Sequence, residues 1–178
     1  MKQTFYGVLL GLILALPACA DEQAVEGVAP IKVDIAAVVG SGVVQPVDGI
    51  SAAGQPSEAA LKVFAKSGYV AVIDLRTEGE NRGFDEAGVV EELGMEYVPM
   101  PIASADDINF GNALKLDQLI KSYEGPVLVH CASSNRVGAL LALADYDNNG
   151  DKDMALAKGK AAGMTGLEGR VKEVLDSE

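Results

Sequence analysis

The residues best suited to chemistry lie in one short stretch, VHCASSNRVG, at positions 129–138. It contains the only histidine of the chain, His130, followed directly by Cys131 and, five positions later, by Arg136. A cysteine in a tight loop that opens a helix lies near backbone N–H groups and the helix dipole, which favour a nucleophilic thiolate. An arginine one turn into that helix can hold two oxygens of an anion in its planar fork. The spacing therefore predicts a cysteine nucleophile beside an anion-binding arginine.

The loop between Cys131 and Arg136 consists of small or polar residues: Ala132, Ser133, Ser134 and Asn135. We expect its backbone N–H groups to bind the anion and its serines to donate hydrogen bonds within the loop. His130 lies one position before the nucleophile on a strand, so its side chain points to the opposite side and cannot serve as the base for Cys131. We expect the imidazole to hydrogen-bond the loop backbone instead. One histidine and one cysteine that point apart cannot complete a tetrahedral site, so the sequence predicts neither a metal nor another cofactor.

Strands and helices alternate around this loop. Apolar runs at 69–76 and 126–130 are typical of buried parallel strands, and a short strand precedes GQPS at 54–57. Pro99 and Pro101 confine the strand at 95–102 to an edge or a terminus. Helices are expected at about 58–67, 85–93, 112–123, 135–144, 154–162 and 167–175. The pattern predicts an α/β fold with three layers around a mostly parallel sheet. It places the Cys131 loop at the carboxyl end of a strand, where such sheets bind ligands.

Four segments, taken in order, resemble a known family. They are GQPS at 54–57, VIDLR at 72–76 with Glu80 following, LGMEYVPMPI at 93–102, and HCASSNRVG at 130–138. Together they are similar to the cysteine-dependent phosphatase superfamily of tyrosine and dual-specificity phosphatases, and most of all to the bacterial beta-lactamase-hydrolase-like phosphatase family. The resemblance covers about residues 45–175. It implies a cysteine-phosphatase-like fold and hydrolysis of phosphate monoesters without metal, with Cys131 as nucleophile, a phosphocysteine intermediate and Arg136 as phosphate clamp.

Two features depart from the familiar phosphatase pattern. Four residues, rather than five, separate Cys131 from Arg136, and this is the spacing of rhodanese-like sulfurtransferases, whose cysteine carries a persulfide. Val137 stands where many tyrosine phosphatases have a serine or threonine that helps the thiolate leave the intermediate. A persulfide sulfurtransferase and a catalytically silent anion-binding module therefore remain alternatives to a phosphatase.

Further candidates lie outside the loop. A phosphatase needs a general acid for the leaving oxygen, and Asp106 and Asp107, in a polar loop before Cys131, are the candidates. Asp74 and Arg76 end the central strand near the same rim, where we expect them to pair with each other.

The stretch DYDNNGDKD, at 145–153, is similar to the first half of a calcium-binding EF-hand loop. Asp145, Asp147, Asn149 and Asp151 alternate as ligands would, and Gly150 occupies the turn. The twelfth position, which should be a bidentate glutamate, is Leu156. We therefore expect a polar connector between two helices.

The N-terminus predicts a targeting segment over residues 1–20, with Lys2 followed by an apolar run too short for a resident membrane span. Ala18-Cys19-Ala20 fits a signal peptidase site, which implies a periplasmic or secreted protein. Alternatively, the segment is a lipoprotein signal over 1–18, and Cys19 becomes a lipidated membrane anchor. Either route leaves Cys131 as the only free thiol. Residues 21–47 are expected to be a linker and 48–178 the folded domain.

The chain is acidic, with a formal net charge of −12. This charge argues against nucleic acid and anionic membrane surfaces, which repel an acidic protein. Membrane contact is therefore expected only through a lipid on Cys19. The expected partner is a phosphorylated substrate, protein or small molecule, bound by a local positive site.

Overall fold

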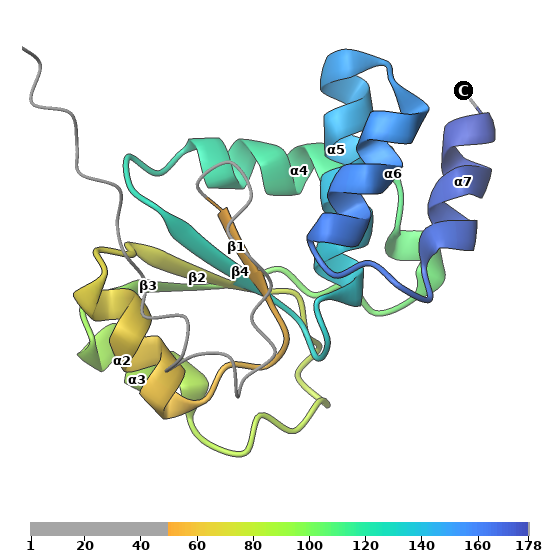
Figure 1. Ribbon diagram of the computed structural model, residues 1–178. Helices are drawn as coiled ribbons and strands as arrows, with labels where there is room; N and C mark the ends of the chain where they lie inside the picture. The colour runs from red at the N-terminus through yellow and green to blue at the C-terminus, as the bar shows by residue number, and fades with distance from the viewer. Residues whose placement is uncertain (1–49, 178) are drawn as a thin grey trace, which may run out of the picture. The chain divides into compact units, whose positions relative to one another are not determined.

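A four-stranded parallel sheet lies at the centre of the domain (Figure 1). The computed structural model describes residues 50–177, so the predicted targeting segment 1–20 and linker 21–47 lie outside the described residues. The strands are β1 (Ile50–Ala53), β2 (Ala71–Asp74), β3 (Glu96–Pro99) and β4 (Val127–His130). Their order is β1-β4-β2-β3, and all three pairings are parallel. The α/β fold is confirmed, the described sheet is wholly parallel, and β3 is an edge strand as its prolines predicted.

Helices cover both faces of the sheet and make three layers (Figure 1). One face carries α2 (Glu58–Lys66) and α3 (Glu86–Glu92). The other carries α4 (Phe110–Lys121) and α5 (Asn135–Asn149), with α6 (Lys152–Ala161) and α7 (Glu168–Asp176) packed on α5. Within residues 50–177, no helix is long and apolar enough to cross a membrane.

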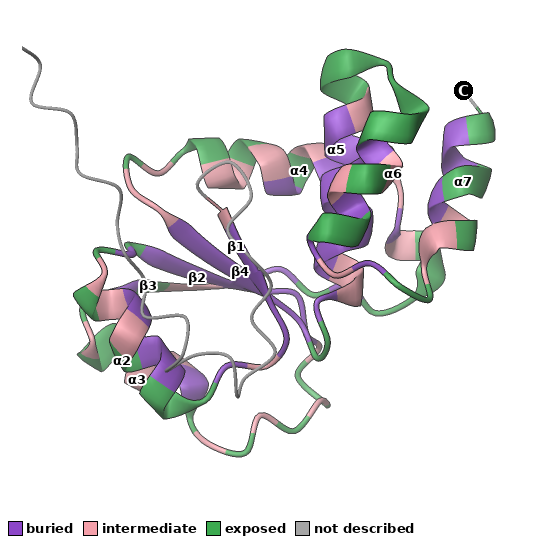
Figure 2. Cartoon of the chain, in the orientation of Figure 1, coloured by how far each residue is buried: buried purple, intermediate pink, exposed green. Residues whose placement is uncertain are grey.

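Successive side chains of each strand enter the two different cores, because side chains alternate across a strand. Val72 and Leu128 pack with α2 and α3, whereas Ile73 and Val129 pack with the helices of the opposite face. Strands β2 and β4 are accordingly buried along their whole length and β1 along most of it, whereas the edge strand β3 is partly exposed (Figure 2). This double burial explains why the strand sequences are nearly continuous apolar runs.

The acidic stretch at 145–153 folds mainly as helix, so the expectation of a connector is wrong. Helix α5 continues to Asn149, and only Gly150 and Asp151 separate it from α6. The Asp145 carboxylate accepts a hydrogen bond from Lys158 Nζ at 2.8 Å, and Asp151 caps α6 by accepting from Met154 N at 3.0 Å. An EF-hand needs these residues in a loop that wraps around the ion, and a helix turns them in different directions.

Two glycines let α5 and α6 approach closely. A Cβ atom at Gly138 would lie 2.4 Å from Gly159 O and 2.5 Å from Met164 N. A Cβ atom at Gly159 would in turn lie 2.8 Å from Gly138 O. Because Gly138 is in the first turns of α5, this contact fixes the end of the helix that follows the Cys131 loop.

Candidate active site

The Cys131 loop joins the end of β4 to the start of α5. Cys131 is buried, and its N–H donates to Ala53 O at 3.2 Å, while Gln55 N donates to Ala132 O at 3.3 Å. These bonds tie the loop to the end of β1. Ser134 has a φ of 64°, a left-handed conformation directly before the helix. Such a turn gathers successive N–H groups around a point where an anion can bind.

Backbone donors are available in this loop. Among the described residues, no group accepts from the N–H of Ala132 or Ser133, and both residues are exposed. The side chains of the next two residues face elsewhere. Ser134 Oγ donates to Ala162 O at 2.8 Å, outside the loop, and Asn135 Oδ1 accepts from Thr165 N at 2.8 Å. These two side chains hold the segment between α6 and α7, which leaves their backbone as the part that can contact an anion.

Arg136 is held in place by Glu80. Its Nη1 donates to Glu80 Oε1 at 2.8 Å and its Nη2 to Glu80 Oε2 at 2.7 Å, an end-on bidentate pair. Nη1 also donates to Ile102 O at 2.9 Å. The nearby Cys131 and the Glu80 carboxylate both raise the pKa of Arg136, with the Glu80 hydrogen bonds as the largest cause.

One edge of the Arg136 guanidinium remains open. Glu80 takes the edge formed by Nη1 and Nη2, and the other side-chain partner of the guanidinium is the Cys131 thiol, the proposed nucleophile. Nε–H and the second Nη2–H lie parallel on the other edge of the planar group, so they can bind two oxygens of one anion. The carboxylate thus orients the arginine without blocking its second fork.

The role of Glu80 was not predicted from the sequence, which indicated it only as part of a family motif. Glu80 also accepts from Thr77 N at 2.9 Å and pairs with Arg76 Nε at 3.3 Å. The Arg136 hydrogen bonds are the main reason that the pKa of Glu80 falls to about 2. Apart from that motif, the sequence offered one signal for this role: Glu80 lies four positions after Arg76, which follows the end of the strand.

Asp74 and Arg76 do not form the ion pair that we predicted. The one bond between the two residues runs from the backbone N–H of Arg76 to Asp74 Oδ1, at 2.8 Å. Its ion-pair partner is Arg82, with Nη2 at 2.6 Å from Asp74 Oδ2, and the Arg76 guanidinium turns to Glu80 and to Gln55. The reason is geometric. Side chains two positions apart point in the same direction only within a strand, and Arg76 lies beyond the end of β2.

His130 lies beside two carboxylates. Its side chain is fully buried, with Nε2 at 3.2 Å from Glu86 Oε1 and 3.6 Å from Asp74 Oδ1. In line with the expected bond to the loop backbone, the Cys131 backbone lies close enough to the ring to favour its protonated form, but neither ring nitrogen makes a well-aligned hydrogen bond with a described residue. Burial lowers the pKa of His130 to about 4 and raises that of Glu86 to about 7. We predicted no metal site from the sequence, because only His130 and Cys131 were considered as possible ligands. The fold brings two further possible ligands, the carboxylates of Asp74 and Glu86, beside His130.

The two candidate acids occupy a short 3-10 helix, η2 (Ala105–Asp107). Asp107 Oδ2 accepts from Ala103 N and Ser104 N, each at 2.9 Å, and these bonds lower the pKa of Asp107. Asp106 is exposed, and no described group hydrogen-bonds its carboxylate. No hydrogen bond or ion pair given for the described residues joins either aspartate to Cys131 or Arg136, and the preceding Ile102 accepts from the arginine through its carbonyl oxygen. The geometry therefore favours Asp106 over Asp107 as a proton donor.

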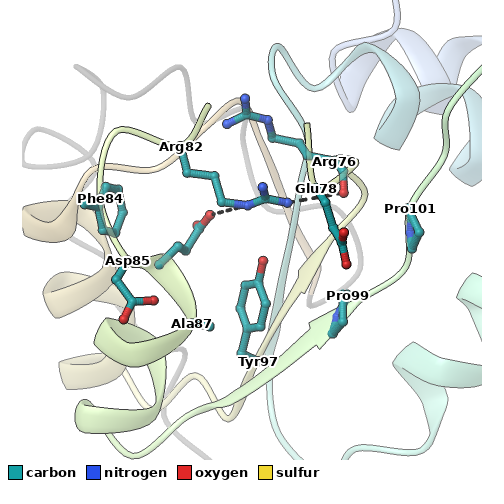
Figure 3. A pocket seen from close by; sticks show the side chains of 10 residues that line it. Arg76, Glu78, Arg82, Phe84, Asp85, Ala87, Tyr97, Pro99 and Pro101 are labelled. Atoms are coloured by element: carbon teal, nitrogen blue, oxygen red, sulfur yellow. Dashed lines mark hydrogen bonds and ion pairs between the residues drawn. The ribbon is translucent and has the colours of Figure 1, made fainter. Parts of the chain in front are cut away.

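A cavity of about 510 Å³ opens beside the His130 cluster (Figure 3). Arg82 reaches across it, and the Tyr97 hydroxyl points toward the Arg82 guanidinium (Figure 3). The rest of the lining includes Arg76, Glu78, Phe84, Asp85, Glu86, Ala87, Pro99 and Pro101. Cys131 is not among the lining residues, so this cavity is separate from the nucleophile.

No family model matches the chain, but curated relatives do. The beta-lactamase hydrolase-like proteins of two Xylella fastidiosa strains are each 32% identical over 120 residues, which is 65% of this chain and 28% of the relative. Over these residues the chain is similar in sequence to the beta-lactamase hydrolase-like proteins. It spans just over a quarter of their length, so the similarity to beta-lactamase hydrolase-like proteins concerns one part of them.

Solved structures show the same fold. A candidate phosphatase from Neisseria meningitidis has a TM-score of 0.64 at 19% identity, covering 75% of this chain and 98% of that one. A candidate phosphatase from Shewanella putrefaciens has a TM-score of 0.59 at 19% identity, covering 80% and 90%. TpbA from P. aeruginosa, as a Cys-to-Ser variant in complex with phosphotyrosine, has a TM-score of 0.58 at 17% identity, covering 75% and 88%. The described part of this chain therefore has the fold of tyrosine-phosphatase-like proteins.

Proposed function

We propose that the protein is a cysteine-dependent phosphatase that hydrolyses phosphate monoesters at Cys131. The observation that carries the proposal is the Arg136 guanidinium, held end-on by Glu80 at 2.7 and 2.8 Å with its second fork open. An arginine oriented in this way beside a cysteine suits a tetrahedral dianion, because the fork binds two phosphate oxygens. The unoccupied N–H groups of Ala132 and Ser133 supply further donors.

The first half-reaction transfers the phosphoryl group to the enzyme. The Cys131 thiolate attacks phosphorus, an S–P bond forms, and the P–O bond to the leaving group breaks. Asp106 gives its proton to the departing oxygen and becomes a carboxylate. Arg136 and the loop N–H groups stabilise the charge on the three other phosphate oxygens.

The second half-reaction releases phosphate. Water attacks phosphorus, its proton passes to the Asp106 carboxylate, and the S–P bond breaks to restore the thiolate and release inorganic phosphate. Val137 is buried and carries no hydroxyl to help the thiolate leave, so we expect this step to limit turnover. Rapid mixing should then show a burst of phenol equal to the enzyme concentration.

A phosphorylated substrate is part of the proposal. The complex of TpbA with phosphotyrosine supports a phosphoester of an aromatic alcohol as the first substrate to try. We also propose that the chain is exported, with residues 1–20 removed or with Cys19 lipidated. The intact mass of protein from the native host tests this: a start at Asp21 or at a lipidated Cys19 is expected, and an unprocessed chain in the cytoplasm contradicts it.

A persulfide sulfurtransferase is the second candidate, because four residues separate Cys131 from Arg136. Both chemistries can be tested on one preparation. The phosphatase proposal expects metal-free hydrolysis of an aryl phosphate that is abolished by Cys131→Ser and strongly reduced by Arg136→Lys, whose point charge cannot replace the fork. Thiocyanate formation from thiosulfate and cyanide, without phosphate release, overturns it. Orthovanadate that binds but no turnover of either kind indicates an anion-binding module.

A further inference from the structure

We propose that Asp74, Glu86 and His130 form a binding site for one divalent cation of the zinc type. The three residues come from the end of β2, the first turn of α3 and the end of β4. One donor atom from each, Oδ1, Oε1 and Nε2 respectively, lies within 4.8 Å of the other two. The inference concerns a second site and is independent of the chemistry at Cys131.

The distances between the donor atoms suit a cation. His130 Nε2 lies 3.2 Å from Glu86 Oε1 and 3.6 Å from Asp74 Oδ1. Ligands at about 2.0 Å from a tetrahedral zinc ion are separated from one another by about 3.3 Å. A cation can therefore enter between these atoms with small side-chain adjustments, and a water molecule can take the fourth position.

The donor atoms are also available. Glu86 Oε1 and both nitrogens of His130 are buried without a hydrogen-bond partner among the described residues. Asp74 Oδ1 accepts from Arg76 N at 2.8 Å and keeps a lone pair. Buried polar atoms without partners are costly, so they require a physical explanation. A shared cation bound through His130 Nε2 satisfies that nitrogen and Glu86 Oε1 at once, and leaves Nδ1 to the backbone of Cys131.

The second oxygen of each carboxylate is held by other groups, which orients the first. Asp74 Oδ2 accepts from Tyr97 Oη and from Arg82 Nε, each at 2.7 Å. Glu86 Oε2 accepts from Gln55 Nε2 at 3.0 Å. Outer partners of this kind fix the ligands of natural metal sites. Arg82 lies near the outer oxygen of both carboxylates, 2.6 Å from Asp74 Oδ2 and 3.7 Å from Glu86 Oε2, while Oδ1 and Oε1 face His130.

The cavity of Figure 3 provides the route of entry. Arg82, Glu86 and Tyr97 belong to its lining, and it has a volume of about 510 Å³. The Arg82 side chain lies across the cavity and donates to Asp74 Oδ2 and to the carbonyl oxygens of Arg76, Thr77 and Glu80, so an entering cation must pass beside it. The alternative occupant of the gap is a single proton between His130 and Glu86, and the experiment below distinguishes it from a cation.

The decisive measurement uses the imidazole itself. Because His130 is the only histidine, untagged full-length protein labelled with 15N-histidine has one Nε2 and one Nδ1 resonance. After treatment with EDTA, addition of Zn2+ should shift the Nε2 resonance and saturate at one zinc per chain. An imidazole spectrum that does not change at saturating Zn2+ overturns the proposal and leaves the proton as the occupant.

Variants identify the other two ligands. Glu86→Gln and Asp74→Asn should each weaken zinc binding by at least about tenfold. Glu78→Gln is the matched control, because Glu78 lines the same cavity but is exposed and lies outside the cluster. Cys131→Ser should also retain affinity; a loss there places the zinc on the thiolate and overturns the site. If the cluster variants fail to fold, the spectrum of the unmodified protein still decides the question.

Discussion

Glu80 and Arg136, 56 positions apart, form an end-on bidentate pair with hydrogen bonds of 2.8 and 2.7 Å. The carboxylate comes from the segment after β2 and the guanidinium from the first turn of α5. The pair therefore joins these two segments at the carboxyl edge of the sheet. Arg136 is partly buried, with 19% of its side chain exposed. An arginine in that position would sample several rotamers without its partner, and each would aim the open fork elsewhere.

Removal of the Glu80 charge should therefore reduce phosphatase activity. We expect Glu80→Gln to lower kcat/KM for an aryl phosphate by about 10- to 100-fold, because Arg136 loses its orientation while its charge remains. Steady-state kinetics measure the effect. Glu78→Gln, two positions away and exposed, is the control and should behave as the unmodified protein. Equal activity of the two variants would contradict the positioning role.

The same pair predicts how stability depends on pH. Arg136 lowers the pKa of Glu80 from 4.5 to about 2, so the folded state favours the carboxylate. Its contribution to the free energy of unfolding is fully present above pH 4.5 and is lost as the pH falls toward 2. Urea unfolding of the unmodified protein and Glu80→Gln should show a stability difference at neutral pH that shrinks across this window. A difference that is constant from neutral pH to pH 2 would exclude the linkage.

Substitutions of the two aspartates of η2 should have different effects. Asp106→Asn should lower kcat by about 100-fold, because it removes the proposed proton donor. Asp107→Asn should affect mainly the stability of the loop, since its carboxylate accepts from Ala103 N and Ser104 N. A leaving group of low pKa, such as p-nitrophenol, needs no proton, so Asp106→Asn should keep the burst of phosphoryl transfer with p-nitrophenyl phosphate while its steady-state turnover stays low. The opposite pattern would assign the acid to Asp107.

The contact between α5 and α6 predicts a strong effect of one methyl group. Gly138→Ala should lower the free energy of unfolding by about 1–3 kcal/mol, since its Cβ would lie 2.4 Å from Gly159 O. Gly169→Ala is the control, because a Cβ there has no atom within 4 Å and alanine favours a helix. Thermal unfolding measures both. A Gly138→Ala variant as stable as the control would show that the helices can separate at no cost.

Local patterns determined the elements of the fold. The continuous apolar runs before Asp74 and Cys131 predicted the two central strands, because a strand covered on both faces must be apolar throughout. Pro99 predicted the edge position of β3, which the sheet order confirms. The cysteine-to-arginine spacing predicted that both residues lie around one loop. The similarity to the beta-lactamase hydrolase-like proteins was also evident from short segments of the sequence.

The tertiary structure alone decided which side chains meet. Asp74 pairs with Arg82 rather than Arg76, Glu80 binds Arg136, and Glu86 lies beside His130. These partners come from segments that are separate in the chain and that meet at the carboxyl edge of the sheet. A sequence specifies periodicity and caps through near neighbours, whereas ion pairs and donor clusters depend on how strands are ordered and how far loops fold over their ends. The chemistry of the loop could therefore be predicted from the sequence, but the residues that orient its arginine could not.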